Sequence, residues 1–583
     1  MKIIAKIYCI LMLQLLCVLF FSGKRIHALS YDYSATTECL AEPWRPHYGG
    51  GLIVNPEFDD GIEGWTVFGQ GAIREGTSHN GNKYIIAHSR TQSLDSFSQK
   101  VQLEKGKFYS FSGWVQISEG SETVFVVFKT SDGKMIHGGK VIAKHGCWSL
   151  LKGGLLPNFT SVVEIFLKSK NTKVEIWADN ISLQSFTKKQ WRSHQEKSID
   201  KVRKHKVKFQ LNYANKTSLD TAIVSIKQTD SNIPFGCGMN QKILSSTDYQ
   251  NWFVSRFKFT TFTNAMKWYS TEEKQGQENY TIADAMVKFS KQNGISIRGH
   301  NILWDDPKYQ PEWVKTLAPK ELRKAAEKRI KSVVSRYSGQ LIAWDVVNEN
   351  LHFRFFEDKL GENASAEFYN KAYQLDPKTA MFMNEYNTTE CAIDEAPNAI
   401  NYKKKLEEIR SFPGNADMLL GIGVQGRFGG DKPPDLAYMR SSLDILASTR
   451  LPIWYTEVSV GNGTNQAQYL EEVLREAYSH PAVEGIITFA GPESAGFKEM
   501  PLVDNDFKNT PAGDVVDKLL AEWKCKNLQL ETTSGSGGSF EVSLPHGDYN
   551  VTVKHPGSNS TTSINFKVTK HLPLGIVNVE VGT

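Results

Sequence analysis

Two glutamates in this chain of 583 residues each come directly after an apolar run. Glu349 ends the segment WDVVNE, and Glu457 ends the segment IWYTE. A carboxyl group at the mouth of an apolar pocket holds its proton more tightly than usual, unless cations or hydrogen-bond donors compensate. Cleavage of a glycosidic bond uses two carboxyl groups, one that protonates the leaving oxygen and one that attacks the anomeric carbon. The pair therefore indicates glycoside chemistry, and a satisfied core acid is the alternative for either glutamate alone.

Further polar and aromatic side chains follow the neighbouring apolar runs. Any one of them alone is more typical of a loop residue or of a satisfied polar group in a core. Their repeated occurrence at the same position after successive runs is harder to attribute to chance, and it predicts one shared binding rim. The candidates are Asn264, Lys267, His300, Trp304, Asn348, Asn384, Tyr386, Asn387, Gln425 and Arg427.

These runs belong to a block, 231–524, in which eight short apolar segments alternate with amphipathic stretches. Eight strand–helix units in one block are typical of a (β/α)8 TIM barrel, which carries its chemistry at the carboxyl ends of the strands. The fourth and seventh strands lie across such a barrel from each other, so Glu349 and Glu457 are expected to flank one pocket. The clearest helical stretches are 319–337, 364–375, 399–411 and 467–479.

The segments outside the barrel indicate β structure. Residues 45–187 alternate apolar and polar positions between Gly and Asn, as in a β-sandwich. The segment 188–230 is interpreted as a linker followed by strands. Residues 187–206, which are polar and basic, are interpreted as the solvated linker. We predict that 203–230 and 526–583 form one small β-sandwich into which the barrel is inserted. Two unrelated β-tails are the alternative.

Composition excludes some classes of function. A net charge of +5 over 583 residues and the absence of a recognisable motif argue against nucleic-acid binding. Residues 1–28 have a basic start and a short apolar run, which predict a secretory signal, with a signal anchor as the alternative. The five Cys beyond it are widely spaced and do not form a metal-binding pattern. Nine N-x-S/T sequons in a secreted chain predict a glycoprotein. No later stretch has the sequence of a membrane span, so we expect no membrane association after signal removal. We also expect a monomer.

The segments RGHNILW, NAMKW, WDVVNE, NEYN, GIGVQG and IWYTE resemble, in order, the strand-end motifs of family-10 glycoside hydrolases, the β-1,4-xylanases. The resemblance implies a retaining (β/α)8 enzyme without cofactor or metal, with Glu349 as acid/base and Glu457 as nucleophile. It implies that Asn348 holds the 2-hydroxyl of the sugar at the cleavage point and that Tyr386 stacks a leaving-side sugar. It also implies that the glycone subsites are lined by Asn264, Lys267, His300 and Trp304.

The N-terminal module is similar to a family-22 carbohydrate-binding module, through segments such as GLIVNPEFDDGIEGW and VEIWADNISL. The resemblance implies xylan binding at an aromatic face or groove. A buried ring is the commoner fate of any single aromatic residue. The candidate sugar contacts are Trp65, Tyr109, Trp114 and Trp148.

The barrel departs from the family pattern close to the proposed nucleophile. Arg427 and Ser459 stand where the family has a His and an Asp that form one network with the nucleophile, Thr263 replaces a Glu, and Phe489 replaces a Trp. We expect Arg427 to pair with Glu457, because they end adjacent strands. The leading interpretation is a secreted endo-1,4-β-xylanase acting on cell-wall xylan or a related hemicellulose. A catalytically weak or inactive xylan-binding homologue and a xylan transglycosylase are the alternatives.

Overall fold

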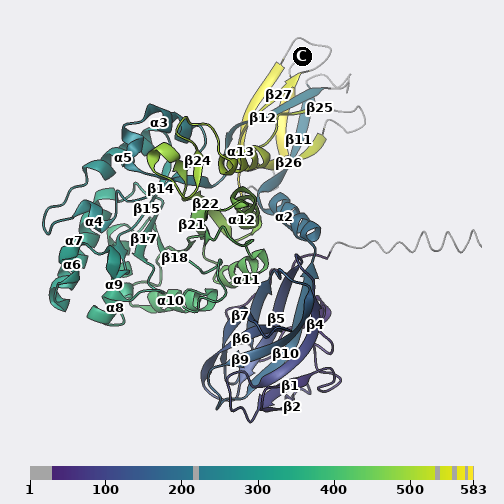
Figure 1. The fold of residues 1–583 in the computed structure, drawn as a ribbon. Coiled ribbons are helices and arrows are strands. Elements are labelled where there is room, and N and C mark those ends of the chain that lie inside the picture. The colour runs from purple at the N-terminus through teal and green to yellow at the C-terminus, as the bar shows by residue number, and fades with distance from the viewer. Residues whose placement is uncertain (1–28, 214–221, 532–538, 555–560, 571–575, 582–583) are drawn as a thin grey trace, which may run out of the picture.

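The computed structural model describes four connected parts of the chain: an N-terminal β module, a helix, a barrel and a small sandwich (Figure 1). The predicted signal, 1–28, and the sequons at Asn215 and Asn559 lie outside the described residues. No helix in the described part of the chain is long and apolar enough to cross a membrane. The described residues are 29–213, 222–531, 539–554, 561–570 and 576–581.

The predicted TIM barrel is confirmed. Eight parallel strands follow one another around the barrel, and β15 pairs with β17 to close it. The barrel strands are β13 (Phe235–Met239), β14 (Phe259–Phe262), β15 (Ser296–Gly299), β17 (Ala343–Asn348), β18 (Ala380–Glu385), β19 (Leu420–Val424), β21 (Ile453–Val460) and β22 (Val483–Thr488). Short strands at the rim are β16 (Leu303–Trp304), β20 (Arg427–Phe428), β23 (Gly491–Pro492) and β24 (Pro501–Val503).

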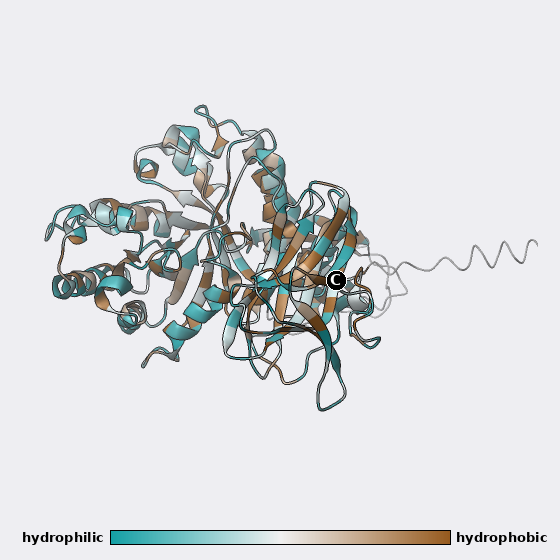
Figure 2. Cartoon of the chain, turned by 60° about the horizontal axis from the view of Figure 1, so that its bottom comes forward, coloured by the Kyte–Doolittle hydropathy of each residue, from teal (hydrophilic) through white to brown (hydrophobic). Residues whose placement is uncertain are grey.

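Helices surround the barrel, and their apolar faces pack on the strands. Figure 2 shows hydrophobic and hydrophilic residues mixed on these helices, as expected for amphipathic segments. The helices are α3 (Thr247–Val254), α4 (Trp268–Thr271), α5 (Thr281–Gln292), α6 (Glu312–Lys315), α7 (Pro319–Tyr337), α8 (Phe355–Leu360), α9 (Ala364–Leu375), α10 (Ala399–Ser411), α11 (Leu436–Ala447), α12 (Gln466–Ser479) and α13 (Pro511–Trp523).

The N-terminal module is a sandwich of two antiparallel five-stranded layers around one apolar core. The layers are joined by a single residue pair, Gly139 with Gly153, where a Cβ on either residue would lie within 2.5 Å of the other strand's backbone. One layer contains β1 (Thr66–Phe68), β4 (Ser96–Leu103), β9 (Ser161–Ser169), β6 (Ser121–Thr130) and β7 (Met135–Lys144). The other contains β8 (Ser149–Leu155), β5 (Phe108–Ile117), β10 (Ile176–Phe186), β3 (Lys83–His88) and β2 (Ala72–Thr77).

The module packs directly on the barrel. Lys152 of β8 forms an ion pair with Asp444 of α11, with 2.6 Å between Nζ and Oδ2 and both side chains fully buried. Asp444 also accepts a hydrogen bond from Tyr31, and its other oxygen lies 3.1 Å from His480 Nε2. Removing one partner of such a pair leaves an uncompensated buried charge and costs about 3–5 kcal/mol. The junction therefore holds the module in one orientation on the barrel.

The interpretation of 187–206 as a solvated linker is wrong. Its residues form α2 (Lys188–Val202), which begins with a capping box between Thr187 and Gln190. Trp191 and Gln195 of α2 are buried and both donate a hydrogen bond of 2.8 Å to the carboxylate of Glu476 on α12. The helix is polar in sequence, yet its buried donors have hydrogen-bond partners on the barrel.

The predicted split sandwich is confirmed. β11 (Lys204–Tyr213) pairs with β26 (Ser539–Pro545) and β29 (Ile576–Val581), and β12 (Ile223–Ser231) pairs with β25 (Leu528–Glu531) and β27 (Gly547–Lys554). β28 (Thr561–Val568) continues the second sheet. Residues from both sides of the barrel share one apolar core. The alternative of two unrelated β-tails is therefore wrong.

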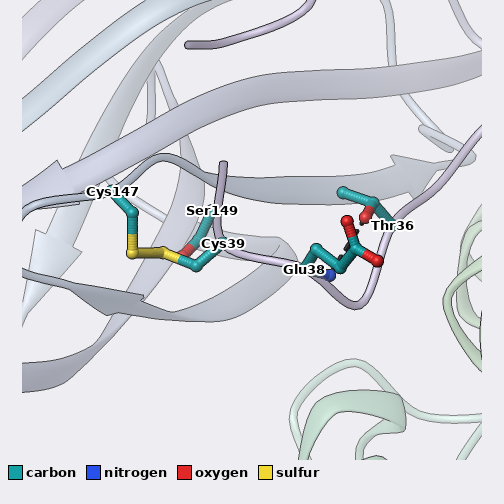
Figure 3. Close-up of a disulfide and its surroundings, with 5 residues drawn as sticks. All are labelled: Thr36, Glu38, Cys39, Cys147 and Ser149. Atoms are coloured by element: carbon teal, nitrogen blue, oxygen red, sulfur yellow. Dashed lines mark hydrogen bonds between the residues drawn. A yellow bond between two sulfur atoms is a disulfide. The ribbon is translucent and has the colours of Figure 1, made fainter. Parts of the chain in front are cut away.

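Figure 3 shows a disulfide between Cys39 and Cys147, whose Cα atoms are 5.3 Å apart. It fixes the N-terminal arm to the module, where Leu40 also pairs with Trp148. Cys237, Cys391 and Cys525 are free thiols. In the described ranges, no three His, Cys, Asp or Glu side chains are grouped as metal ligands.

Candidate active site

Glu349 follows the last residue of β17 in the left-handed region, at φ 61°. Its carboxyl group accepts hydrogen bonds of 2.8 Å from Trp304 Nε1 and from Gln425 Nε2, and the residue is only 7% exposed. Burial raises the pKa of Glu349, and the negative charge of Glu457 contributes to the same shift. The protonated form of Glu349 is therefore favoured more than in water, as a general acid requires.

Glu457 lies within β21 and is 4% exposed. Its Oε1 accepts a hydrogen bond of 3.1 Å from Asn384 Nδ2, and its Oε2 pairs with the Arg427 guanidinium, as predicted from the sequence. Burial alone would raise the pKa of Glu457, but the charges of Arg427, His300 and Lys267 outweigh it and lower the pKa to about 2. Glu457 is therefore ionised at any ordinary pH.

A chain of hydrogen bonds links the two carboxyl groups. Gln425 donates through Nε2 to Glu349, and its Oε1 accepts from Arg427 Nε over 3.1 Å. Arg427 then donates to Glu457 through Nη2. Its guanidinium carbon lies 4.6 Å from the ring centroid of Phe489. Arg427 is therefore fixed by Gln425, Glu457 and Phe489, and the two glutamates are the two ends of one hydrogen-bond chain.

The floor of the site is a network of buried amides and one imidazole. Asn384 Nδ2 donates to Asn348 Oδ1 as well as to Glu457, and His300 Nδ1 lies 2.9 Å from Asp345 Oδ2. His300 Nε2 lies 3.9 Å from Glu457 Oε1. The buried Asn348 Nδ2 has no hydrogen-bond partner among the described residues, so one donor of this network is unpaired.

A cleft of about 670 Å³ adjoins the two glutamates through Trp304 and Arg427, which line the cleft and donate hydrogen bonds to Glu349 and Glu457. Lys267 lies in its wall with Nζ 4.5 Å from the centroid of the Trp304 ring, which stacks on Tyr309 at 4.1 Å. Burial lowers the pKa of Lys267 to about 8. Aromatic walls with a few polar groups are typical of sugar sites. Other lining residues are Thr263, Asn264, Tyr269, Asn279, Arg427 and Phe489.

Tyr386 belongs to a second group of side chains at the rim. Its ring stacks on the imidazole of His352 with centroids 3.7 Å apart and planes within 3°. The two ring nitrogens of His352 lie 2.7 Å from Glu385 and 3.1 Å from Asp394. Burial would lower the pKa of His352, but these two carboxylates raise it overall. The imidazole therefore forms a fixed support behind Tyr386.

The structure places Glu349, Glu457 and the ten other predicted site residues at the carboxyl ends of the barrel strands or in the segments that follow them. Sequence reasoning missed His352, Glu385 and Asp394 as a unit, because His352 follows β17 whereas Glu385 ends β18 and Asp394 lies in the segment after it. Sequence reasoning also missed Asp345 as the partner of His300. Its place within the WDVVNE segment, three positions before Asn348, was the signal that could have identified it.

The four aromatic candidates on the N-terminal module do not fit a sugar-stacking role. Their exposed fractions are 1–6%, because the rings fill the core or lie beneath the N-terminal arm. The prediction that these four rings contact sugar is therefore wrong. Trp44 is 40% exposed and Trp177 is half-buried, so these two rings present more surface.

Comparison with known proteins gives matches along the chain. Residues 224–515 match the family described as glycosyl hydrolase family 10, and residues 50–172 match a carbohydrate binding domain. The finer likeness of the module to family 22 remains a prediction. Two relatives from Arabidopsis thaliana are "Endo-1,4-beta-xylanase 5-like", 47% identical over 96% of both chains, and "Endo-1,4-beta-xylanase 4", 43% identical over 94% of both.

One similar solved structure is xylanase 10B from Thermotoga petrophila RKU-1 in complex with xylobiose. It is 23% identical with a TM-score of 0.44, covering 50% of this chain and 94% of that one. The family match covers half of the chain and coincides with the barrel. The similarity to the two Arabidopsis thaliana relatives extends over nearly the whole chain. The chain belongs to glycosyl hydrolase family 10 and carries an N-terminal carbohydrate-binding domain.

Proposed function

We propose that this protein is a secreted, retaining endo-1,4-β-xylanase that hydrolyses cell-wall xylan or a related hemicellulose as a monomer. The observation that carries the proposal is that the pKa values of two glutamates, joined by hydrogen bonds through Gln425 and Arg427, are shifted in opposite directions. The pKa of Glu349 is raised and that of Glu457 is lowered to about 2. Environments that push two such pKa values apart assign one group as acid and the other as nucleophile.

In the first step, Glu457 attacks the anomeric carbon while Glu349 protonates the leaving oxygen, which gives a glycosyl-enzyme ester. In the second step, Glu349 takes a proton from water, and the water displaces Glu457 from the sugar. The free donor of Asn348 is suited to the 2-hydroxyl, and Lys267 and Trp304 are suited to the glycone sugars. Tyr386, supported by His352, provides a stacking surface for the leaving-side sugar.

The Arg427–Glu457 pair favours a second candidate function. Formation of the ester removes the negative charge of Glu457, so an ion pair that stabilises the carboxylate slows the attack. A xylan-binding protein with little hydrolytic activity is therefore the alternative. A transglycosylase, which passes the sugar to another sugar instead of to water, is a variant of the proposed xylanase. Secretion is supported by the Cys39–Cys147 disulfide, since disulfides persist in oxidising compartments.

The test is product release from xylan by the pure full-length protein, with the Glu457→Gln variant as control. Hydrolysis with the wild type alone, and a product that first appears as the β-anomer by proton NMR, is the expected result. An α-anomer contradicts the retaining mechanism. Release no greater than that of the control, with xylan binding preserved, selects the binding protein, and products longer than an added oligosaccharide substrate select the transglycosylase.

A further inference from the structure

One N-glycosylation sequon lies in the wall of the cleft that runs beside the two glutamates. Asn279, Tyr280 and Thr281 form the sequence Asn-Tyr-Thr at the end of the connection between α4 and α5, and Thr281 is the first residue of α5. Asn279 is exposed and lines the 670 Å³ cleft. Among the sequons in the described ranges, only Asn279 lines this cleft.

The local structure leaves the reactive atom of Asn279 free. Its backbone N–H donates to Thr271 O over 2.7 Å, and its Oδ1 accepts from the Thr281 N–H over 3.0 Å. Its Nδ2, the atom that carries an N-linked glycan, has no hydrogen bond to any described residue. The side chain is therefore held in place through its oxygen while its nitrogen remains available.

The neighbouring surface also favours a covering group. Ile282, three residues after Asn279, lines the same cleft and is 41% exposed. An exposed isoleucine in a cleft that Tyr269 also lines gives apolar surface that sugar rings cover well through their C–H faces. A glycan on Asn279 would begin next to this surface.

We propose that Asn279 carries an N-linked glycan, which forms the outer wall of the glycone side of the cleft and limits how many substrate sugars bind there. The proposal rests on the proposed function as a secreted xylanase. The glycan comes from a polyprenyl-diphosphate donor. A bond forms between Asn279 Nδ2 and C1 of the first sugar, the C1–O bond to the diphosphate breaks, and the proton lost from Nδ2 leaves with the diphosphate.

The test uses the full-length protein secreted from a eukaryotic host, with occupancy of Asn279 read by peptide mass spectrometry. Thr281→Ala removes the sequon but leaves the Asn279 side chain, and Asn279→Gln removes both. Thr281→Ser preserves the sequon, and Asn158→Gln removes an exposed sequon on the distant module. The first two variants are expected to behave alike, and the last two like the wild type.

Loss of the glycan is expected to shift cleavage of xylohexaose toward its reducing end, because more sugars fit on the glycone side. Binding of xylohexaose, measured in a Glu457→Gln background, should tighten by about 3–10-fold, roughly one added sugar–aromatic contact. An unmodified Asn279, or Thr281→Ala with wild-type affinity, overturns the proposal. If no variant hydrolyses xylan, the proposed function fails, while occupancy and binding still decide the role of Asn279.

Discussion

Replacing the cation beside the proposed nucleophile, Glu457, is expected to raise turnover. The double variant Arg427→His with Ser459→Asp removes the permanent charge that pairs with Glu457 and introduces a hydrogen-bonded pair at two residues already opposite each other. Arg427 and Ser459 are register partners in the β20–β21 ladder, so the new side chains start from adjacent backbone positions. The double change is therefore local to the nucleophile.

The size of the effect follows from the electrostatics of Glu457. Its pKa of about 2, against an ordinary value of 4.5, corresponds to about 3 kcal/mol in favour of the ionised form. Arg427 is the strongest of the three cations that contribute. If Arg427 supplies roughly half of this stabilisation, and the attack removes it, the barrier is on the order of 1–2 kcal/mol higher than without the pair. Turnover of the double variant should therefore rise about 10-fold.

The assay is kcat on xylohexaose, whose poor leaving group makes the attack of Glu457 the slow step. Arg427→Lys is the matched control, since it retains the charge without the planar fork of the guanidinium. It should remain close to the wild-type rate. A double variant with native circular dichroism and melting temperature, but with equal or lower kcat, refutes the reasoning. The replacement of the family's Trp by Phe489, or a different substrate, would then be the explanation for any slow turnover of xylan.

Three further results are expected. Because Glu457 stays ionised down to a pKa of about 2, the pH profile of kcat/KM should have no acid limb from it above about pH 3, and an acid limb near pH 4–5 would contradict the ion pair. His352→Ala should weaken binding of leaving-side sugars about 3–10-fold, because the ring behind Tyr386 is lost. His352→Phe preserves a ring and should retain most of the wild-type affinity. Both are measured by KM for xylo-oligosaccharides of increasing length. A fragment of residues 29–187, which retains the disulfide, should be retarded in a native gel containing soluble xylan, and Trp177→Ala should reduce the retardation; no retardation of the folded fragment would leave the module with its fold alone.

The barrel was predictable because its information is local. The expected helices 319–337, 364–375 and 399–411 have the same bounds as α7, α9 and α10, since an apolar stripe defines each of them. The positions of the site residues followed from the barrel, because each lies near the end of an apolar strand or in the segment that follows it. The pairing of Arg427 with Glu457 followed from the adjacency of their strands.

The parts that were missed depend on contacts between distant segments. α2 is polar, and what stabilises its buried face is Glu476, nearly 300 residues away in the sequence. The support of Tyr386 by His352 depends on the conformation of two loops, which no periodicity encodes. In the module, the sequence identified aromatic residues but did not distinguish core rings from surface rings, since both occur on alternating strands.

The division of the small sandwich between the two ends of the barrel has a consequence for synthesis on the ribosome. β12 ends at Ser231, and its first partner strand, β25, begins at Leu528, roughly 300 residues later. At about 5–20 residues per second, β11 and β12 wait roughly 15–60 s with open edges while the barrel emerges. Unpaired edges invite pairing with other chains. A chain truncated after the barrel would therefore contain the whole barrel and two strands with unpaired edges. The last 58 residues supply the strands that pair with β11 and β12 and cover those edges.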